Sequence, residues 1–182
     1  AQAAFELSKV LWDRGDEEGA LTAGELAADG LLALGKEAAA VPTIINNCTM
    51  ALWTDQNDKA LAWGRKATDL ADRWADQHHR ELAAMCRGRA ERRAGHHLAA
   101  IDFARRAAGI SAREHYWWDA AISAEDGARA ADEIGDTATA VELRSLAVDH
   151  WAREGNRPRE VEALIDLSAT HMAAGSHEQA RH

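Results

Sequence analysis

Small and apolar residues recur along the chain at intervals of 40 residues. Each recurrence centres on a short segment that opens with Gly or, in the second copy, with Asp: Gly15, Asp55, Gly95, Gly135 and Gly175. Five residues after each of these comes an alanine, and seven residues later another alanine falls on the same face of a helix: Ala20, Ala60, Ala100, Ala140 and Ala180, then Ala27, Ala67, Ala107 and Ala147. A third column of small residues precedes the turn: Ser8, Cys48, Gly88, Ala128 and Ser168. Small residues at helical spacing favour helices that pack closely.

The recurring Gly suits a residue that ends a helix in the left-handed conformation, which Asp also tolerates. The pattern therefore predicts a turn between two helices in every copy. The expected helices span 2–14, 17–34, 39–54, 57–75, 78–94, 97–112, 117–134, 137–154 and 158–174, with ends uncertain by about 2 to 4 residues.

The composition agrees with an all-α fold. Hydrophobic residues make up 47% of the chain, alanine dominates them, and proline occurs only at Pro42 and Pro158. No segment alternates apolar and polar positions over a run of β-branched residues, so we expect no sheet.

The repeated pattern resembles the tetratricopeptide repeat (TPR), in which a small residue in the first helix is followed by Gly at the turn and two alanines in the second helix. The stretch Ile45-Asn46-Asn47-Cys48-Thr49-Met50-Ala51-Leu52 resembles the long-repeat branch that includes kinesin light chains and bacterial peptide-sensing regulators. The resemblance implies a right-handed superhelical solenoid of antiparallel helix pairs, with roughly four and a half repeats. It covers 1–182 as a single domain with repeats near 1–38, 39–76, 77–114, 115–155 and 156–182. The third repeat departs from the pattern, because Arg87 and Glu91 stand where the family usually buries apolar side chains.

Charge and cysteine content narrow the classes of function. The formal net charge of −9 argues against general nucleic-acid binding, which needs a basic surface. No apolar run is long enough for a membrane span and no secretory leader opens the chain, so a cytoplasmic protein is expected. Cys48 and Cys86 are interpreted as small, reduced core residues. The chain begins at Ala1, and a helical pattern begins and stops over 179–182, as expected for a piece of a longer protein.

The resemblance also places a ligand. In the family, the first helices line a concave groove, and the stripe beside the small-residue column corresponds here to Lys9, Thr49, Arg89, Arg129 and Ala169. One turn further on are Arg92 and Arg93, and Asn46 lies on the neighbouring stripe. Arg and Asn can hold carboxylates and extended peptide backbone, which indicates an acidic peptide as ligand. The alternative is that Arg87, Arg89, Arg92 and Arg93 form a solvated helix face balanced by Glu81 and Glu91.

Seven tryptophans are many for 182 residues, and most are expected in the core. In the run His115-Tyr116-Trp117-Trp118, four consecutive bulky side chains cannot all point inward on one helix. We expect Trp117 or Tyr116 to face the groove or a partner.

Signatures of catalysis and metal binding are absent from the sequence. The adjacent pairs His78-His79 and His96-His97 diverge on a helix, so neither presents two ligands to one metal ion. No phosphate-binding glycine loop or nucleophile elbow occurs. We therefore expect a non-catalytic, regulatory module without cofactor or metal that binds a protein or peptide segment. Two alternatives are a sensor or spacer segment of a multidomain bacterial transcription regulator, and self-assembly through the solenoid ends as a homo-oligomer.

Overall fold

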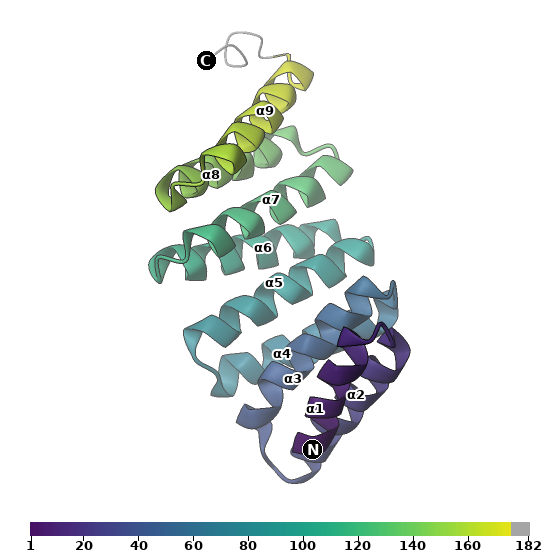
Figure 1. Ribbon diagram of the computed structural model, residues 1–182. Helices are drawn as coiled ribbons and strands as arrows, with labels where there is room; N and C mark the ends of the chain where they lie inside the picture. Colours follow the sequence, from purple (N-terminus) through teal and green to yellow (C-terminus); the bar gives the residue numbers. More distant parts are fainter. Residues whose placement is uncertain (176–182) are drawn as a thin grey trace. The chain divides into compact units, whose positions relative to one another are not determined.

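The computed structural model describes residues 1–175, and in this part of the chain it contains helices and turns but no strand. Within residues 1–175 nine helices follow one another (Figure 1): α1 (Gln2–Asp13), α2 (Glu17–Ala33), α3 (Glu37–Trp53), α4 (Asn57–Trp74), α5 (Gln77–Arg93), α6 (His97–Arg113), α7 (Trp117–Glu133), α8 (Thr137–Glu154) and α9 (Arg157–Ala173). The all-α prediction is confirmed, and every predicted helix end lies within two residues of the observed one. The predicted turn at 175–180 lies, beyond Gly175, outside the described residues.

Left-handed residues end the helices at intervals of about 20 residues. Gly15, with φ of 78°, and Asp55, with φ of 55°, lie in predicted turns, as do Gly95 and Gly135. In the first turn the Asp16 N–H donates to the Leu11 carbonyl at 2.9 Å, and the Gln56 N–H donates to Ala51 in the same way at 2.8 Å. These bonds satisfy carbonyls that the end of a helix would otherwise leave unpaired.

The turns between successive pairs use the same conformation, which the 40-residue pattern does not predict. Gly35, His115 and Gly155 have φ of 67°, 62° and 75°. The turn after α4 is different, because Ala75 is extended there and the Asp76 side chain accepts a hydrogen bond from the His79 N–H at 2.9 Å. Except after α4, the same left-handed helix ending is therefore used twice in each pair.

The described residues form two compact units, Ala1–Ala94 with α1 to α5 and a second that begins at Gly95 with α6 to α9. In unit 1 each helix packs on the next one, and α3 also contacts α5. In unit 2, α6 packs on α7, α7 on α8 and α8 on α9. The predicted alanine columns form the helix contacts: all eight described members, Ala20, Ala60, Ala100, Ala140, Ala27, Ala67, Ala107 and Ala147, are buried.

The column of small residues in the first helices lies against the start of the second helices. Ser8 is buried, and its hydroxyl donates to the Ala20 carbonyl at 2.8 Å. Cys48 repeats the contact one pair later, with its Sγ 3.3 Å from the Ala60 carbonyl oxygen. A larger side chain at either position would push the two helices apart.

The interpretation of the two cysteines as reduced residues is wrong. Both are buried as predicted, but they form a disulfide that joins α3 to α5, with Cα atoms 6.5 Å apart. Cys86 lies 38 residues after Cys48 rather than 40, so it sits two positions before the small-residue column. That offset turns the Cys86 side chain towards α3, whereas a residue within the column packs against the second helix of its own pair.

Candidate functional site

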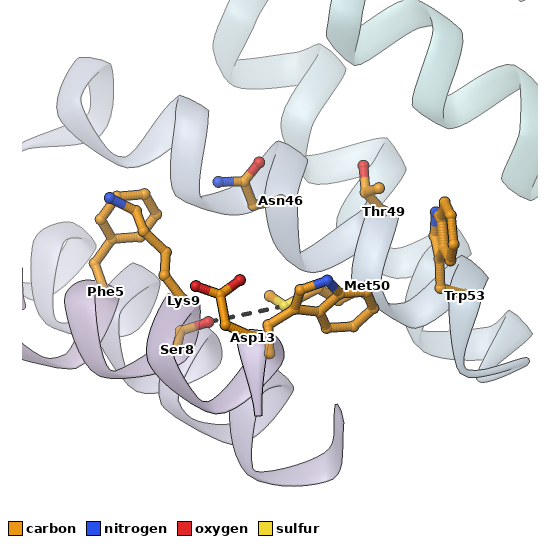
Figure 2. A pocket seen from close by; sticks show the side chains of 9 residues that line it. Phe5, Ser8, Lys9, Asp13, Asn46, Thr49, Met50 and Trp53 are labelled. Carbon is orange, nitrogen blue, oxygen red and sulfur yellow. Dashed lines mark hydrogen bonds between the residues drawn. The ribbon is translucent and has the colours of Figure 1, made fainter. Parts of the chain in front are cut away.

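A pocket opens between α1 and α3, the first helices of two successive pairs in unit 1 (Figure 2). It has a volume of about 330 Å³ and is lined by Phe5, Ser8, Lys9, Trp12, Asp13, Asn46, Thr49, Met50 and Trp53. Three of the predicted groove residues, Lys9, Asn46 and Thr49, thus lie around one pocket.

The floor of the pocket is made by two buried side chains. Ser8 and Met50 are 4% and 8% exposed, and the Ser8 Oγ lies 3.8 Å from the Met50 Sδ. Because the small-residue column brings Ser8 to the bottom, α1 leaves a depression above it. Met50 adds a polarisable surface that adapts to ligands of different shape.

Aromatic side chains form the walls. The Trp12 and Trp53 rings meet edge to face, with centroids 6.3 Å apart and planes at 83°. Trp53 is 73% exposed, the largest value among the exposed large hydrophobic residues of the described chain. Exposed tryptophan beside a depression is typical of binding hot spots, because it offers a large contact area at a small entropic cost.

The polar groups at the pocket differ in how they are engaged. The Lys9 ammonium lies 3.1 Å from a Glu6 carboxylate oxygen and 4.8 Å from the centre of the Phe5 ring. The Thr49 hydroxyl donates to the Ile45 carbonyl of its own helix at 3.1 Å. The side chains of Asp13 and Asn46 make no hydrogen bond or ion pair within residues 1–175. Their carboxylate and amide therefore remain open to a ligand.

The predicted groove arginines of α5 lie in unit 1, as the α1–α3 pocket does. Arg93 forms an ion pair with Asp55, and Arg89 and Arg92 are half-buried and engaged with other groups. Arg87 lies deeper, where its guanidinium donates to the Thr68 hydroxyl at 2.7 Å and lies 3.4 Å from Glu91.

The alternative of a solvated face balanced by Glu81 and Glu91 is wrong in one respect. Both carboxylates are buried, at 0% and 2% exposure. The buried Glu91 carboxylate lies 3.4 Å from both Arg65 of α4 and Arg87, whose side chains are 51% and 22% exposed. These ion pairs take the place of the usual apolar contact.

The remaining predicted residues, Trp117 and Arg129, lie in unit 2. Arg129 donates to Asp126 at 2.9 Å and to Glu125 at 3.4 Å, both on its own helix. Trp117 stacks on His150, with ring centroids 5.8 Å apart, and carries the Arg153 guanidinium 4.9 Å from its ring. Its neighbours Tyr116 and Trp118 are exposed, whereas Trp117 is half-buried.

Sequence reasoning missed five residues around the pocket: Phe5, Trp12, Asp13, Met50 and Trp53. Helical spacing could have found two of them, because Asp13 and Trp53 lie one turn beyond Lys9 and Thr49. These two equivalent positions carry different chemistry, a carboxylate in the first repeat and an indole in the second.

Residues 1–175 contain neither a helix that could span a membrane nor a metal-binding cluster. No described helix is long and apolar enough to cross a membrane. Within the same residues, His, Cys, Asp and Glu side chains form no group of three that could hold a metal ion.

The helix pairs and their small-residue columns define a TPR-like helical repeat fold. No protein-family model and no curated protein sequence matches the chain. Among solved structures, RapI in its apo form superimposes with a TM-score of 0.81 at 12% identity, over 97% of this chain and 49% of RapI. A kinesin light chain-like protein of Podosopora anserina with nearly identical TPR-like repeats gives a TM-score of 0.81 at 16% identity, over 99% of this chain and 89% of that one.

A Rap protein complexed with Competence and Sporulation Factor is similar as well. Its TM-score is 0.69 at 13% identity, over 97% of this chain and 50% of the Rap protein. The chain thus spans about half the length of both Rap proteins. At these identities the similarity shows a shared fold.

Proposed function

We propose that this chain is a non-catalytic module that binds a protein or peptide segment along the first helices of unit 1. The observation that carries the proposal is the α1–α3 pocket, which is lined by exposed Trp53, the open Asn46 amide and the open Asp13 carboxylate. An amide that both donates and accepts suits the backbone of an extended segment, and the exposed indole suits a side chain of that segment.

The α5 arginines extend the binding surface. A ligand carboxylate could replace Asp55 as the partner of Arg93, because both Arg93 and Asp55 are solvent-exposed and an exposed ion pair contributes little. We therefore propose that an acidic part of the ligand lies towards α5. The overall charge of −9 makes a nucleic acid an unfavourable partner.

We further propose that this binding serves a regulatory role. A Rap protein of similar fold has been crystallised with Competence and Sporulation Factor, which supports a fold able to receive a signalling ligand. Such a module would serve as the sensor segment of a larger regulator.

The test is a peptide-array screen of the whole chain with acidic and neutral peptides at low and moderate salt. Capture by the α5 arginines should weaken as salt screens the charges. For captured peptides, Trp53→Ala should weaken binding about tenfold or more, as expected when a hot-spot tryptophan is removed.

Trp74→Ala is the matched control. Trp74 is also exposed, but it lies on α4 outside the pocket lining, where its indole N–H donates to Glu37 at 2.6 Å. Equal binding by wild type and Trp53→Ala would remove the pocket from the proposal. If the chain captured no peptide, the proposal that it is a peptide-binding module would be refuted.

Self-association is a second candidate function. On α9 the side chains of Val161, Leu164, Ile165 and Met172 are exposed and follow helical spacing along one stripe. Exposed apolar side chains arranged in this way favour contact with another copy. Sedimentation velocity over a range of concentrations should show association that Ile165→Glu abolishes, and a constant monomer would exclude it.

A further inference from the structure

We propose that the α1–α3 pocket is specific for an arginine side chain presented by the bound segment. This proposal rests on the proposed function, because it assigns the chemistry of one ligand residue in the same site. It differs from the expectation of a wholly acidic peptide, which derives from the arginines of α5.

The balance of charge at the pocket is the first support. Glu6 and Lys9 are 3.1 Å apart, so their charges largely cancel. The Asp13 carboxylate makes no ion pair or hydrogen bond within the described part of the chain, so its negative charge is not balanced there. Figure 2 shows Asp13 rising from α1 beside the pocket, with Asn46 set on the facing helix. An acidic ligand side chain would be repelled here, and a basic one attracted.

The aromatic walls distinguish arginine from lysine. A guanidinium is planar and weakly hydrated, so it can stack on an indole while donating to a carboxylate in its own plane. Trp12 and Trp53 meet at 83°, so the two rings offer faces in two directions around the same space. A lysine ammonium could pair with Asp13 but would keep more of its hydration.

The floor distinguishes arginine from a purely apolar side chain. The methylenes of arginine can cover Met50 and the Trp12 ring while the charged end remains at the rim. A leucine would cover the same apolar surface but would partly remove water from Asp13 without supplying a hydrogen bond in return, which is unfavourable. Arginine therefore uses the floor, the walls and the carboxylate together.

The experiment uses the whole chain and capped pentapeptides Gly-Ala-X-Ala-Gly, with X as arginine, citrulline, lysine or leucine. Citrulline keeps the planar shape of arginine but lacks the charge. Binding is followed through the indole N–H signals of Trp12 and Trp53 in nitrogen-15 NMR spectra, assigned with the variants Trp12→Phe and Trp53→Phe. We expect the arginine peptide to bind about tenfold more tightly than the citrulline peptide, which corresponds to about 1.4 kcal/mol.

Asp13→Asn should bring the arginine peptide down to the affinity of the citrulline peptide. Asp29→Asn is the matched control, because it removes one negative charge from an exposed position of α2 that does not line the pocket. It should leave the preference for arginine unchanged.

Equal affinity for all four peptides, or an arginine preference that survives Asp13→Asn, would overturn the arginine proposal and leave the proposed peptide site in place. If the indole signals of Trp12 and Trp53 respond to none of these peptides, nor to peptides captured in the array screen, both the arginine proposal and the pocket as a peptide site are overturned.

Discussion

Unit 1 and unit 2 are built from similar helices, but one tryptophan in each, Trp53 in unit 1 and Trp151 in unit 2, is used in the opposite way. In unit 2, Trp151 is fully buried on α8, and its indole N–H donates to Glu125 of α7 at 2.7 Å. Arg159 of α9 lies 5.0 Å from the Trp151 ring and also donates to Glu125, at 3.0 Å. In unit 1, Trp53 ends α3 largely exposed and touches Trp12 only edge to face.

Other side chains of the first helices differ as well, although most predicted groove residues of unit 1, such as Lys9 and Arg93, also have partners. In unit 2, the predicted groove residues Arg129 and Trp117 are engaged by neighbours within the unit. In unit 1, Asp13 and Asn46 make no such contact within the described residues. A repeat fold can thus keep one scaffold and vary only the partners of its surface side chains, so binding is best sought where those partners are missing.

Removing one tryptophan from each unit should give the largest difference. Trp151→Ala should lower the free energy of unfolding by about 3–5 kcal/mol, because it opens a cavity in the core. Trp53→Ala should cost less than about 1 kcal/mol, since the exposed ring contributes little beyond its contact with Trp12. Urea denaturation followed by circular dichroism measures both.

Trp151→Phe serves as the control for shape. It keeps most of the packing but removes the hydrogen bond to Glu125, so a loss of about 1–3 kcal/mol is expected. Similar losses for Trp151→Ala and Trp53→Ala would mean that the two tryptophans do not differ in role.

A smaller effect should test how tightly unit 2 is packed. A Cβ added at Gly127 of α7 would lie 2.9 Å from the Ala104 Cβ and 3.0 Å from a Leu143 methyl carbon. Gly127→Ala should therefore destabilise the chain by about 1–3 kcal/mol. Gly109→Ala, on α6, meets only the end of the Arg113 side chain at 3.6 Å and should stabilise by about 0.5–1 kcal/mol through helix propensity.

The same denaturation measurement compares the two glycine variants. Both replace a helical Gly by Ala in unit 2, so helix propensity alone predicts the same gain for each. A gain at Gly127 equal to that at Gly109 would show that α7 can move away from its neighbours without cost.

The parts of the fold that sequence predicts are those set by steric requirements repeated in every copy. A left-handed turn favours Gly, as at Gly15, and is tolerated by a few other residues such as Asp55, and a close helix crossing needs a small residue, as at Ser8 and Ala20. These requirements recur at one spacing, so the period fixes helix ends to within two residues.

The candidate site was only partly predictable, because binding chemistry does not repeat. Asp13 and Trp53 occupy the same position in successive repeats, and a periodic pattern cannot say that a carboxylate and an indole lie around one pocket. Cys86 was misjudged for a related reason: its distance of 38 residues from Cys48 departs from the period, and only the packing of α3 on α5 brings the two together.

The smallest expected effect is a pH dependence located in unit 2. His150 stacks on Trp117, and burial lowers the pKa of its imidazole. The positive charge of Arg153 lowers this pKa further, whereas the negative charge of Asp149 raises it. In the unfolded chain this histidine takes up its proton near pH 6.5, but in the folded chain only at lower pH. As the pH falls below about 7, the unfolded state therefore binds more protons, and the free energy of unfolding decreases until the folded-state pKa is reached.

His150→Phe keeps an aromatic ring against Trp117 and removes the titration, while the other histidines remain common to both chains. The difference in free energy of unfolding between wild type and His150→Phe should be constant above about pH 7.5 and should shift against the wild type between about pH 7 and 5. A difference that stays constant over the whole range would show that His150 is as accessible to protons in the folded chain as in the unfolded one, and that unit 2 does not bury its aromatic contacts in the way that sets it apart from the open pocket of unit 1.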